Sequence, residues 1–291
     1  MPRLSILMAV YNRLDLTRRC LTTLEGSLTG VIDYEVIIVD DLSTDGTRDF
    51  LQTLSPPYRV VLNDHKGNFS INNNRAASLA RGELLCLLNN DTELPPGWFQ
   101  PMLAALESHR DAGFIGNVQR IPATGRYDHF GVVFPPWLTP IHYGQHLRRA
   151  PAFTRTTPVT PWSAVTAACC LTRRETFLAA GGFDEAYVNG CEDMDLCLRM
   201  HRLGLRHYVA NTSEILHHKG ASPGRKKHNN TNLARFKSLW ADTLRRDFVA
   251  RDARLAARSY LRGALAQPLR TNAAKFFRSL LVLAGISRWT S

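Results

Sequence analysis

The chain has 291 residues, enough for one large domain or for one domain with a substantial appendage. Its composition, 44% hydrophobic and 21% charged, is typical of a globular protein with a sizeable core, and no apolar run approaches the roughly 18 residues of a membrane span. The net charge of +11 is localised, because residues 242–291 hold ten basic and three acidic residues, a net +7. The rest of the chain is therefore close to neutral.

The first hundred residues alternate between apolar strands and helices. Residues 4–11 predict a buried strand that is followed by a helix, and "YEVIIVDD" with "TRDFLQTL" repeats this order. A short strand at "YRVVLND" precedes the loop "HKGNFS" and a helix from Ile71 to Ala80, with Gly82 as its expected stop signal. "ELLCLLNND" is the fourth strand. Continuously apolar strands that alternate with helices predict an α/β fold with a mainly parallel sheet covered on both faces.

The pattern changes after the predicted helix "PPGWFQPMLAALESH". Residues 115–165 are rich in proline, glycine and aromatic residues, which favours hairpins and loops over another strand–helix unit. A strand and a helix are predicted in "SAVTAACCLTRRETFLAAGGFDE", a second helix in "EDMDLCLRMHRLGL" and a closing strand in "RHYVANTSEILHH". The last 50 residues are predicted to be helical and basic.

The cysteines and the N-terminus indicate a compartment. The six cysteines include no C-x-x-C pair, and Cys86 and Cys169 lie in apolar runs, where free thiols pack as small hydrophobic groups. This pattern favours a reducing compartment over a disulfide framework. The segment "MPRLSILMAVYN" lacks the length and the cleavage site of a signal peptide. We therefore expect a cytoplasmic protein.

Polar clusters close several of the predicted elements. Asp40-Asp41 and Asn90-Asp91 follow strands, Glu192-Asp193 with Asp195 opens a helix, and His217-His218 follows the last strand. Each cluster alone has an ordinary explanation as a turn, as acids at the positive end of a helix dipole or as a solvated loop. Open α/β sheets bind ligands at the carboxyl ends of their strands, and carboxylates with an imidazole suit Mn²⁺ or Mg²⁺.

The sequence contains neither of the common glycine-rich phosphate loops, G-x-G-x-x-G and G-x-x-x-x-G-K-[ST]. A bound diphosphate would then depend on a metal for charge neutralisation, so we expect a metal–diphosphate site at this edge of the sheet. The helix that begins at Glu192 also follows a loop with two further acids, Asp184 and Glu185. Crowded carboxylates bind protons more tightly, which suits a general base.

The segments "LSILMAVYNR", "EVIIVDDLSTDGT", "ARGELLCLLNNDTELPPGW" and "GGFDEAYVNGCEDMDLCLRMHRLGLRHYVANTSEILHHKGAS", in this order, resemble the inverting family 2 glycosyltransferases of the GT-A fold. The resemblance covers residues 3 to 222, and its nearest subgroup is the rhamnosyltransferase-like enzymes of bacterial surface-polysaccharide assembly. It implies transfer of a sugar from a nucleotide-diphospho-sugar to a hydroxyl of a glycan or lipid-linked acceptor. It also implies a catalytic domain over residues 1–240, with a nucleotide-binding half (1–100) and an acceptor-binding half (101–240), and a helical basic tail over 241–291.

The resemblance also implies roles for individual residues. Asp193 matches the general base, and Glu192 is expected to position the acceptor or the base. Asp91 matches the metal-binding acid, with His217 as the histidine that completes the Mn²⁺ or Mg²⁺ site and His218 as second choice. Trp162 and Gly182 match the acceptor side. The positions that match the nucleotide site are Ala9, Tyr11, Arg13, Asp40, Asp41, Asn74 and Asn90.

Two positions depart from the family pattern. The metal motif usually offers two acids, whereas Asn89 and Asn90 precede Asp91 here. Relatives often have Asn-x-Gly-Phe before the third helix, whereas this chain has "KGNFSINNN", with Asn68 before Phe69. The first departure bears on the strength of metal binding, and the second on the course of the loop near the diphosphate.

The C-terminal segment "NAAKFFRSLLVLAGISRW" predicts a basic amphipathic helix, in which five apolar side chains accompany Lys275, Arg278 and Arg288. Such a helix can lie in an anionic membrane interface or pack on the catalytic domain or another subunit, and both remain open. The five apolar residues are Phe276, Phe277, Leu280, Leu281 and Leu283.

Two other functions are open at this point. A nucleotidyltransferase would need a basic residue in a glycine-rich turn, which "MAVYNRLD" does not supply. A non-catalytic nucleic-acid-binding protein would fit the isoelectric point of about 9.7, but the charge is confined to one tail and no recognisable nucleic-acid-binding motif is present.

Overall fold

The computed structural model describes residues 2–219, 227–266 and 271–286. Its first half contains four parallel strands, in the spatial order β4-β1-β2-β3, that are joined by helices. The bounds are β1 (Leu4–Val10), α1 (Leu14–Leu28), β2 (Tyr34–Asp40), α2 (Thr47–Gln52), β3 (Tyr58–Leu62), α3 (Phe69–Leu79), β4 (Leu84–Leu88) and α4 (Phe99–Ser108). The predicted strand–helix alternation is confirmed.

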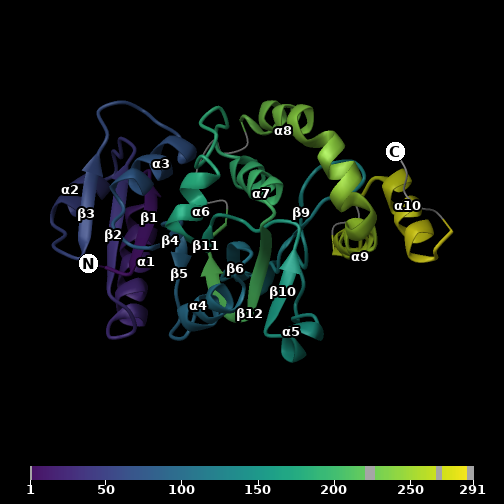
Figure 1. The fold of residues 1–291 in the computed structure, drawn as a ribbon, viewed down its shortest axis with the longest axis horizontal. Coiled ribbons are helices and arrows are strands. Elements are labelled where there is room, and N and C mark those ends of the chain that lie inside the picture. Colours follow the sequence, from purple (N-terminus) through teal and green to yellow (C-terminus); the bar gives the residue numbers. More distant parts are fainter. Residues whose placement is uncertain (1, 220–226, 267–270, 287–291) are drawn as a thin grey trace.

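The second half extends the same sheet in the order β4-β11-β6-β12-β10. β11 runs antiparallel to both neighbours, whereas β12 is parallel to β6. The bounds are β5 (Thr92–Glu93), β6 (Ala112–Ile121), β7 (Arg126–His129), β8 (Val132–Val133), β9 (Ile141–His142), α5 (Phe153–Thr156), β10 (Val159–Trp162), β11 (Cys169–Arg173), α6 (Arg174–Ala179), α7 (Glu192–Arg202) and β12 (Arg206–His217). Figure 1 shows the N-terminal strands at one end of the molecule, with β12 and β10 between them and the C-terminal helices.

Two buried clusters cover the two faces of the sheet. In β2, Val36 and Ile38 belong to one cluster and Ile37 and Val39 to the other, because side chains alternate along a strand. Helices α1 and α4 pack on the first face, and α3, α6 and α7 pack on the second. The expected two-sided burial is confirmed, and it leaves the carboxyl ends of the strands as the polar edge.

The predicted role of Gly82 as a helix stop is wrong. Helix α3 ends at Leu79, and the next residue, Ala80, already has an extended backbone. A Cβ on Gly82 would lie 2.7 Å from the backbone nitrogen of Ser5, and the N–H of Gly82 donates to the Ser5 hydroxyl over 2.8 Å. The glycine therefore lets the chain pass close to β1 before β4 begins.

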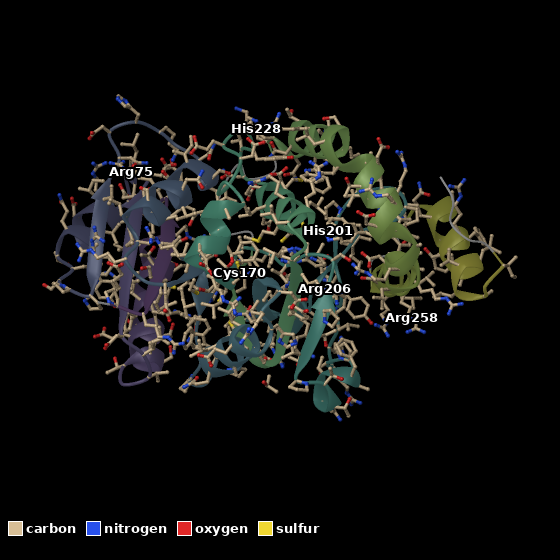
Figure 2. All side chains as sticks on the ribbon, in the orientation of Figure 1. Arg75, Cys170, His201, Arg206, His228 and Arg258 are labelled. Atoms are coloured by element: carbon tan, nitrogen blue, oxygen red, sulfur yellow. The ribbon has the colours of Figure 1, made fainter. Side chains whose placement is uncertain are left out.

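The C-terminal region is helical, as expected, and consists of α8 (Asn229–Leu244), a π-helical turn (Arg245–Val249), α9 (Ala250–Ala266) and α10 (Ala273–Leu283). The core continues into it, because Phe236, Trp240 and Phe248 belong to the same buried cluster as α7. Figure 2 shows His201 of α7 near these helices, and its Nε2 lies 3.3 Å from Asp247. The division at residue 240 stays a prediction, since packing is continuous across it.

The structure also bears on the expectations for the cysteines and for membrane-spanning helices. All six cysteines are free thiols, and five of them are buried. In the described ranges, no helix combines the length and the hydropathy that a bilayer crossing requires. Arg288, expected beside the apolar C-terminal residues, lies outside the described residues.

Candidate active site

The carboxyl end of β2 holds a preformed cluster of hydrogen bonds around Asp41. This buried carboxylate accepts the N–H of Gly67 over 2.6 Å and the amide of Asn63 over 3.2 Å, and Lys66 Nζ lies 3.0 Å away. Burial alone would raise the pKa of Asp41, but these donors outweigh it and lower the pKa. Lys66 Nζ also sits 3.0 Å above the ring of Tyr11, which is 44% exposed. The cluster offers a charged acceptor and an open aromatic face.

Asp40 faces away from this cluster and supports the loop after β2. Its side chain is fully buried, accepts the N–H of Ser43 over 3.3 Å and lies 3.6 Å from Arg48. Ala9 is half-buried near the carboxyl end of β1, opposite Val39. Arg13 follows with a left-handed backbone at φ 64° and leads into α1. Asp40 therefore holds the loop, whereas Ala9 and Arg13 border the same edge of the sheet as Asp41.

Asn90 ties the end of β4 to the turn after β1. Its Nδ2 donates to the hydroxyl of Thr17 over 2.9 Å and to the carbonyl of Asn12 over 3.4 Å. The amide thus fixes two neighbouring loops at the polar edge without adding charge. Its predicted contact with a nucleotide stays a prediction.

Asp91 and His217 meet at the centre of this edge, although 126 positions separate them in the chain. Both side chains are buried, and His217 Nε2 lies 3.3 Å from Asp91 Oδ1. Gln119 donates its amide to Asn117 Oδ1 over 3.4 Å, so its Oε1 faces His217 Nδ1 at 3.2 Å as an acceptor. This contact orients the imidazole so that its Nε2 faces the carboxylate of Asp91. The Nε2 atom makes no hydrogen bond in the described part of the chain.

The neighbouring histidine has a different partner. His218 Nε2 lies 2.5 Å from Glu93 Oε1, and Glu93 also accepts from Arg19 over 3.1 Å. Burial would raise the pKa of Glu93, but His218 and Arg19 lower it. The His218 backbone N–H donates to the carbonyl of Asp91, so this residue supports the loop through its main chain. Between the two predicted histidines, the geometry favours His217 as the partner of Asp91.

Asp193 reaches the same edge from the first turn of α7. Its Oδ2 accepts the N–H of Ala167 over 3.3 Å, and the carbonyl of the next residue, Ala168, accepts the N–H of Asn89 over 2.9 Å. One short contact path therefore joins Asp193 to the Asn89-Asn90-Asp91 segment. Glu192 is buried beside it and accepts the N–H of Gly190.

The other acids near α7 pair with cations and amides rather than with one another. Asp195 accepts from Trp240 Nε1 over 2.7 Å and from Arg199 over 2.8 Å. Asp184 pairs with Arg235 at 2.6 Å. Glu185 accepts from an asparagine amide over 3.0 Å. Asp195 lies in the first turn of α7, as the sequence indicates, and each of these three acids has its own donor or cation as a partner. The expectation that crowding suits a general base stays a prediction.

Asn74 and Gly182, predicted for the nucleotide and the acceptor, lie against each other. Asn74 donates to the carbonyl of Phe183 over 2.9 Å and accepts its N–H over 2.8 Å. Gly182 has φ +64°, and a Cβ there would lie 2.7 Å from Asn74 Oδ1, so this contact requires glycine. Trp162 is only 7% exposed and packs on Tyr143 with ring centroids 5.0 Å apart. Ligand contacts of all three stay predictions.

Sequence reasoning missed a second buried network beside His217. Asp128 is fully buried and accepts from Lys219 over 2.7 Å and from Gln145 over 3.0 Å. Burial would raise the pKa of Asp128, but His142 and Lys219 lower it well below its usual range. Sequence reasoning also missed Lys66 and Gln119. "HKGN" after a strand is a local signal that could have found Lys66, whereas no local signal marks Gln119.

Comparison with known proteins identifies the family. Residues 5–176 match the family model described as glycosyl transferase family 2. The chain belongs to glycosyltransferase family 2. Relatives include the O-antigen biosynthesis protein RfbC of Myxococcus xanthus, 34% identical over 76% of this chain. They also include an N-acetylglucosaminyl-diphospho-decaprenol L-rhamnosyltransferase of Mycobacterium tuberculosis, 27% identical over 65% of this chain and 68% of that protein. The match takes in 18% of RfbC, so this chain spans less than a fifth of that relative.

A solved structure of GalNAc-T7 with UDP, GalNAc and Mn²⁺ shares the fold of this family 2 chain. The TM-score is 0.65 at 13% sequence identity, and the superposition covers 98% of this chain and 55% of the other. The expected GT-A fold is thereby confirmed. Family membership also favours a glycosyltransferase over a nucleotidyltransferase and over a non-catalytic basic protein.

Proposed function

We propose that the chain is an inverting glycosyltransferase that moves a sugar from a nucleotide-diphospho-sugar to a hydroxyl of a glycan or lipid-linked acceptor. One observation carries the proposal. Asp193, Asn89 and the Asp91–His217 pair lie along one path of contacts at one edge of the sheet. A general base and a cation-binding pair are groups that such a transfer needs together. The name of RfbC supports a role in O-antigen biosynthesis, and the name of the Mycobacterium tuberculosis relative supports a lipid-linked acceptor.

We propose that the nucleotide lies along the ends of β1 and β2. The exposed ring of Tyr11 is available to stack on the base, and Asp41 is available as an acceptor for hydroxyls of the ribose. Lys66 pairs with both groups and fixes their relative position. Asn90 holds the loop between these residues and Asp91.

The Asp91–His217 pair fits a divalent cation. A buried imidazole nitrogen and a carboxylate oxygen, here 3.3 Å apart, are both ligand types that bind Mn²⁺ or Mg²⁺. The described residues hold no cluster of three or more His, Cys, Asp or Glu ligands, so the protein would supply two donors and the diphosphate the others. Mn²⁺ in the GalNAc-T7 structure supports this assignment. When bound, the ion would offset the charge of the departing diphosphate.

In the proposed reaction, Asp193 accepts the proton of the acceptor hydroxyl while that oxygen attacks the anomeric carbon. The new oxygen–carbon bond forms on the face opposite the diphosphate, and the bond to the diphosphate oxygen breaks with its electron pair. The configuration at the anomeric carbon is therefore inverted. Glu192, held by the N–H of Gly190, would keep the start of α7 in place.

We further propose that α10 contacts an anionic membrane at the cytoplasmic face, where lipid-linked acceptors lie. Phe277, Leu280 and Leu281 are 64%, 42% and 40% exposed and share one face of the helix at spacings of three and four residues. Ser279 and Val282 are buried on another face. Arg278 adds positive charge next to the apolar stripe, as in an interfacial helix, whereas Lys275 lies on the other side of α10 with its Nζ 4.9 Å from the centroid of the Trp137 ring.

The donor assignment can be tested by measuring the melting temperature of the protein with a panel of nucleotide sugars, with and without Mn²⁺. Binding to the folded state raises the melting temperature by mass action. We expect at least one nucleotide-diphospho-sugar to stabilise the protein, more strongly when Mn²⁺ is present. If no member of the panel shifts the melting temperature in either condition, the donor assignment is wrong.

A further inference from the structure

A cavity of about 310 Å³ lies between residues 137–146 and the C-terminal helical region. One wall comes from the segment around β9, and the other from α9 and Thr271. Figure 1 shows α9 and α10 grouped at the end of the molecule away from the N-terminal strands. The lining residues include Trp137, Gln145, His146, Ser259, Tyr260 and Gly263.

The lining combines aromatic faces with hydrogen-bonding groups. The rings of Trp137 and Tyr260 come from the two walls, with centroids 5.6 Å apart and planes inclined at 70°, and both side chains are partly exposed. Lys275 Nζ lies 4.9 Å from the centroid of the Trp137 ring, so a saccharide would stack on the part of the indole that Lys275 leaves uncovered. Gln145, His146 and Ser259 supply polar groups around them. A sugar ring has apolar C–H faces and a rim of hydroxyls, so it matches this lining better than a hydrocarbon chain does. The volume, near the lower end of the range of about 300–1,000 Å³ for small-molecule pockets, suits a short saccharide.

Hydrogen bonds connect the cavity with the candidate active site. Gln145 lines the cavity and donates to the buried Asp128 over 3.0 Å, and Asp128 accepts from Lys219 over 2.7 Å. Lys219 lies two residues beyond His217, the partner of Asp91. His146, also in the lining, has a left-handed backbone at φ 70°, and such strain in a non-glycine residue is retained where the surroundings fix it. The wall is therefore joined, through Asp128 and Lys219, to the chain segment that carries His217.

We propose that this cavity binds a saccharide unit of the acceptor, with the sugar ring against Trp137 and Tyr260 and its hydroxyls on Gln145, His146 and Ser259. The inference rests on the proposed function for its link to transfer. It makes α9 part of the acceptor site, because Tyr260, Ser259 and Gly263 form one of the two walls.

Gly263 provides a clean test. It is inside α9 and lines the cavity, and a Cβ built on it meets no atom within 4 Å, so Gly263→Leu adds its side chain at the cavity wall. Leucine is also the better helix former by up to about 1 kcal/mol, so the variant should fold. Gly26→Leu is the matched control, because Gly26 is likewise inside a helix with nothing within 4 Å, but in α1.

The measurement is saturation-transfer NMR with methyl glycosides of rhamnose, glucose, galactose and N-acetylglucosamine and the corresponding disaccharides. We expect at least one saccharide to receive saturation from the wild type and from Gly26→Leu, and to bind Gly263→Leu at least tenfold more weakly. Trp137→Leu, which removes the indole face, should show the same loss. The proposal is overturned if no saccharide in the panel binds, or if Gly263→Leu and Trp137→Leu bind as the wild type does.

The nucleotide-sugar melting assay, run on the same proteins, separates this inference from the proposed function. Stabilisation by the donor should be equal in the wild type, Gly263→Leu and Gly26→Leu. Equal donor stabilisation without a saccharide difference removes the cavity proposal alone. Absence of donor stabilisation in the wild type removes the proposed function, whatever the saccharides do.

Discussion

The two sides of the candidate site are built in different ways. On the nucleotide side, the partners of Asp40 and Asp41 all come from residues 43–67, the segment that follows β2 in the chain. On the catalytic side, Asp91 meets His217, and Asp193 meets Ala167, through contacts distant in sequence. The contacts of the first side form within one stretch of the chain, whereas those of the second depend on segments that the fold brings together. We infer that the nucleotide side is preorganised and that ligand binding orders the catalytic side further.

The largest expected effect comes from Asp193→Asn. If Asp193 is the base, the variant cannot take the hydroxyl proton, and transfer should fall by about 10²–10⁴-fold. Donor stabilisation in the melting assay should remain, because the nucleotide side is unchanged. The matched control is Asp242→Asn, at a carboxylate whose side chain is 98% exposed, and it should retain full transfer. Full activity of Asp193→Asn would remove Asp193 from its proposed role.

The two adjacent histidines give the next test, because they differ in partner but hardly in position. His217→Ala should reduce the Mn²⁺-dependent part of donor stabilisation and lower transfer by at least tenfold, since one of two protein donors is lost. His218→Ala loses only the contact with Glu93 and should keep most of the Mn²⁺ effect. Titration of Mn²⁺ against donor binding measures both variants. Equal losses in the two would contradict the assignment of His217.

Gln119 tests the same site through a residue that contacts His217 rather than the proposed ion. Gln119→Leu removes the acceptor that orients His217, and partners of this kind typically contribute about 10–100-fold to metal affinity. The apparent Mn²⁺ affinity should therefore fall while transfer at saturating Mn²⁺ largely recovers. A variant that folds with unchanged Mn²⁺ affinity would show that Gln119 does not orient the imidazole.

The same division explains what the sequence could predict. The strands and the acids at their ends follow from local hydrophobic pattern and turn chemistry, so the edge of the sheet and the positions of Asp41 and Asp91 could be predicted. The register of β12 against β5 and β6 is a long-range property, and it alone decides that His217 rather than His218 faces Asp91. The helix-stop prediction for Gly82 was wrong for a similar reason, because its contact with Ser5 joins two segments that lie 77 positions apart in the chain. The role of Asp195 could not be predicted, because its hydrogen-bond partner Trp240 lies 45 positions away in the chain.

The C-terminal helix allows a test of a smaller, surface effect. Phe277→Asp with Leu281→Asp should lower binding to vesicles of phosphatidylcholine and phosphatidylglycerol by at least tenfold, because each buried apolar side chain contributes up to about 1.5–3 kcal/mol. Both positions are exposed, so folding should be unaffected. Leu178→Asp with Leu203→Asp, also at exposed leucines but away from α10, is the control. Equal flotation of both double variants and the wild type would exclude membrane contact through α10.

The smallest effect concerns the preorganised side and its dependence on pH. The folded-state pKa of Asp41 is lowered below the usual value of about 3.9, because the donors of Gly67 and Lys66 outweigh burial. The stability that Asp41 contributes is therefore present above about pH 4 and is lost as the pH falls through the lower, folded-state value. Asp41→Asn should cost on the order of 1 kcal/mol at pH 7, and this difference from the wild type should shrink below about pH 4. Denaturant unfolding of both proteins between pH 3 and pH 7 measures it, and a difference that is constant with pH would mean that the charge of Asp41 does not stabilise the cluster.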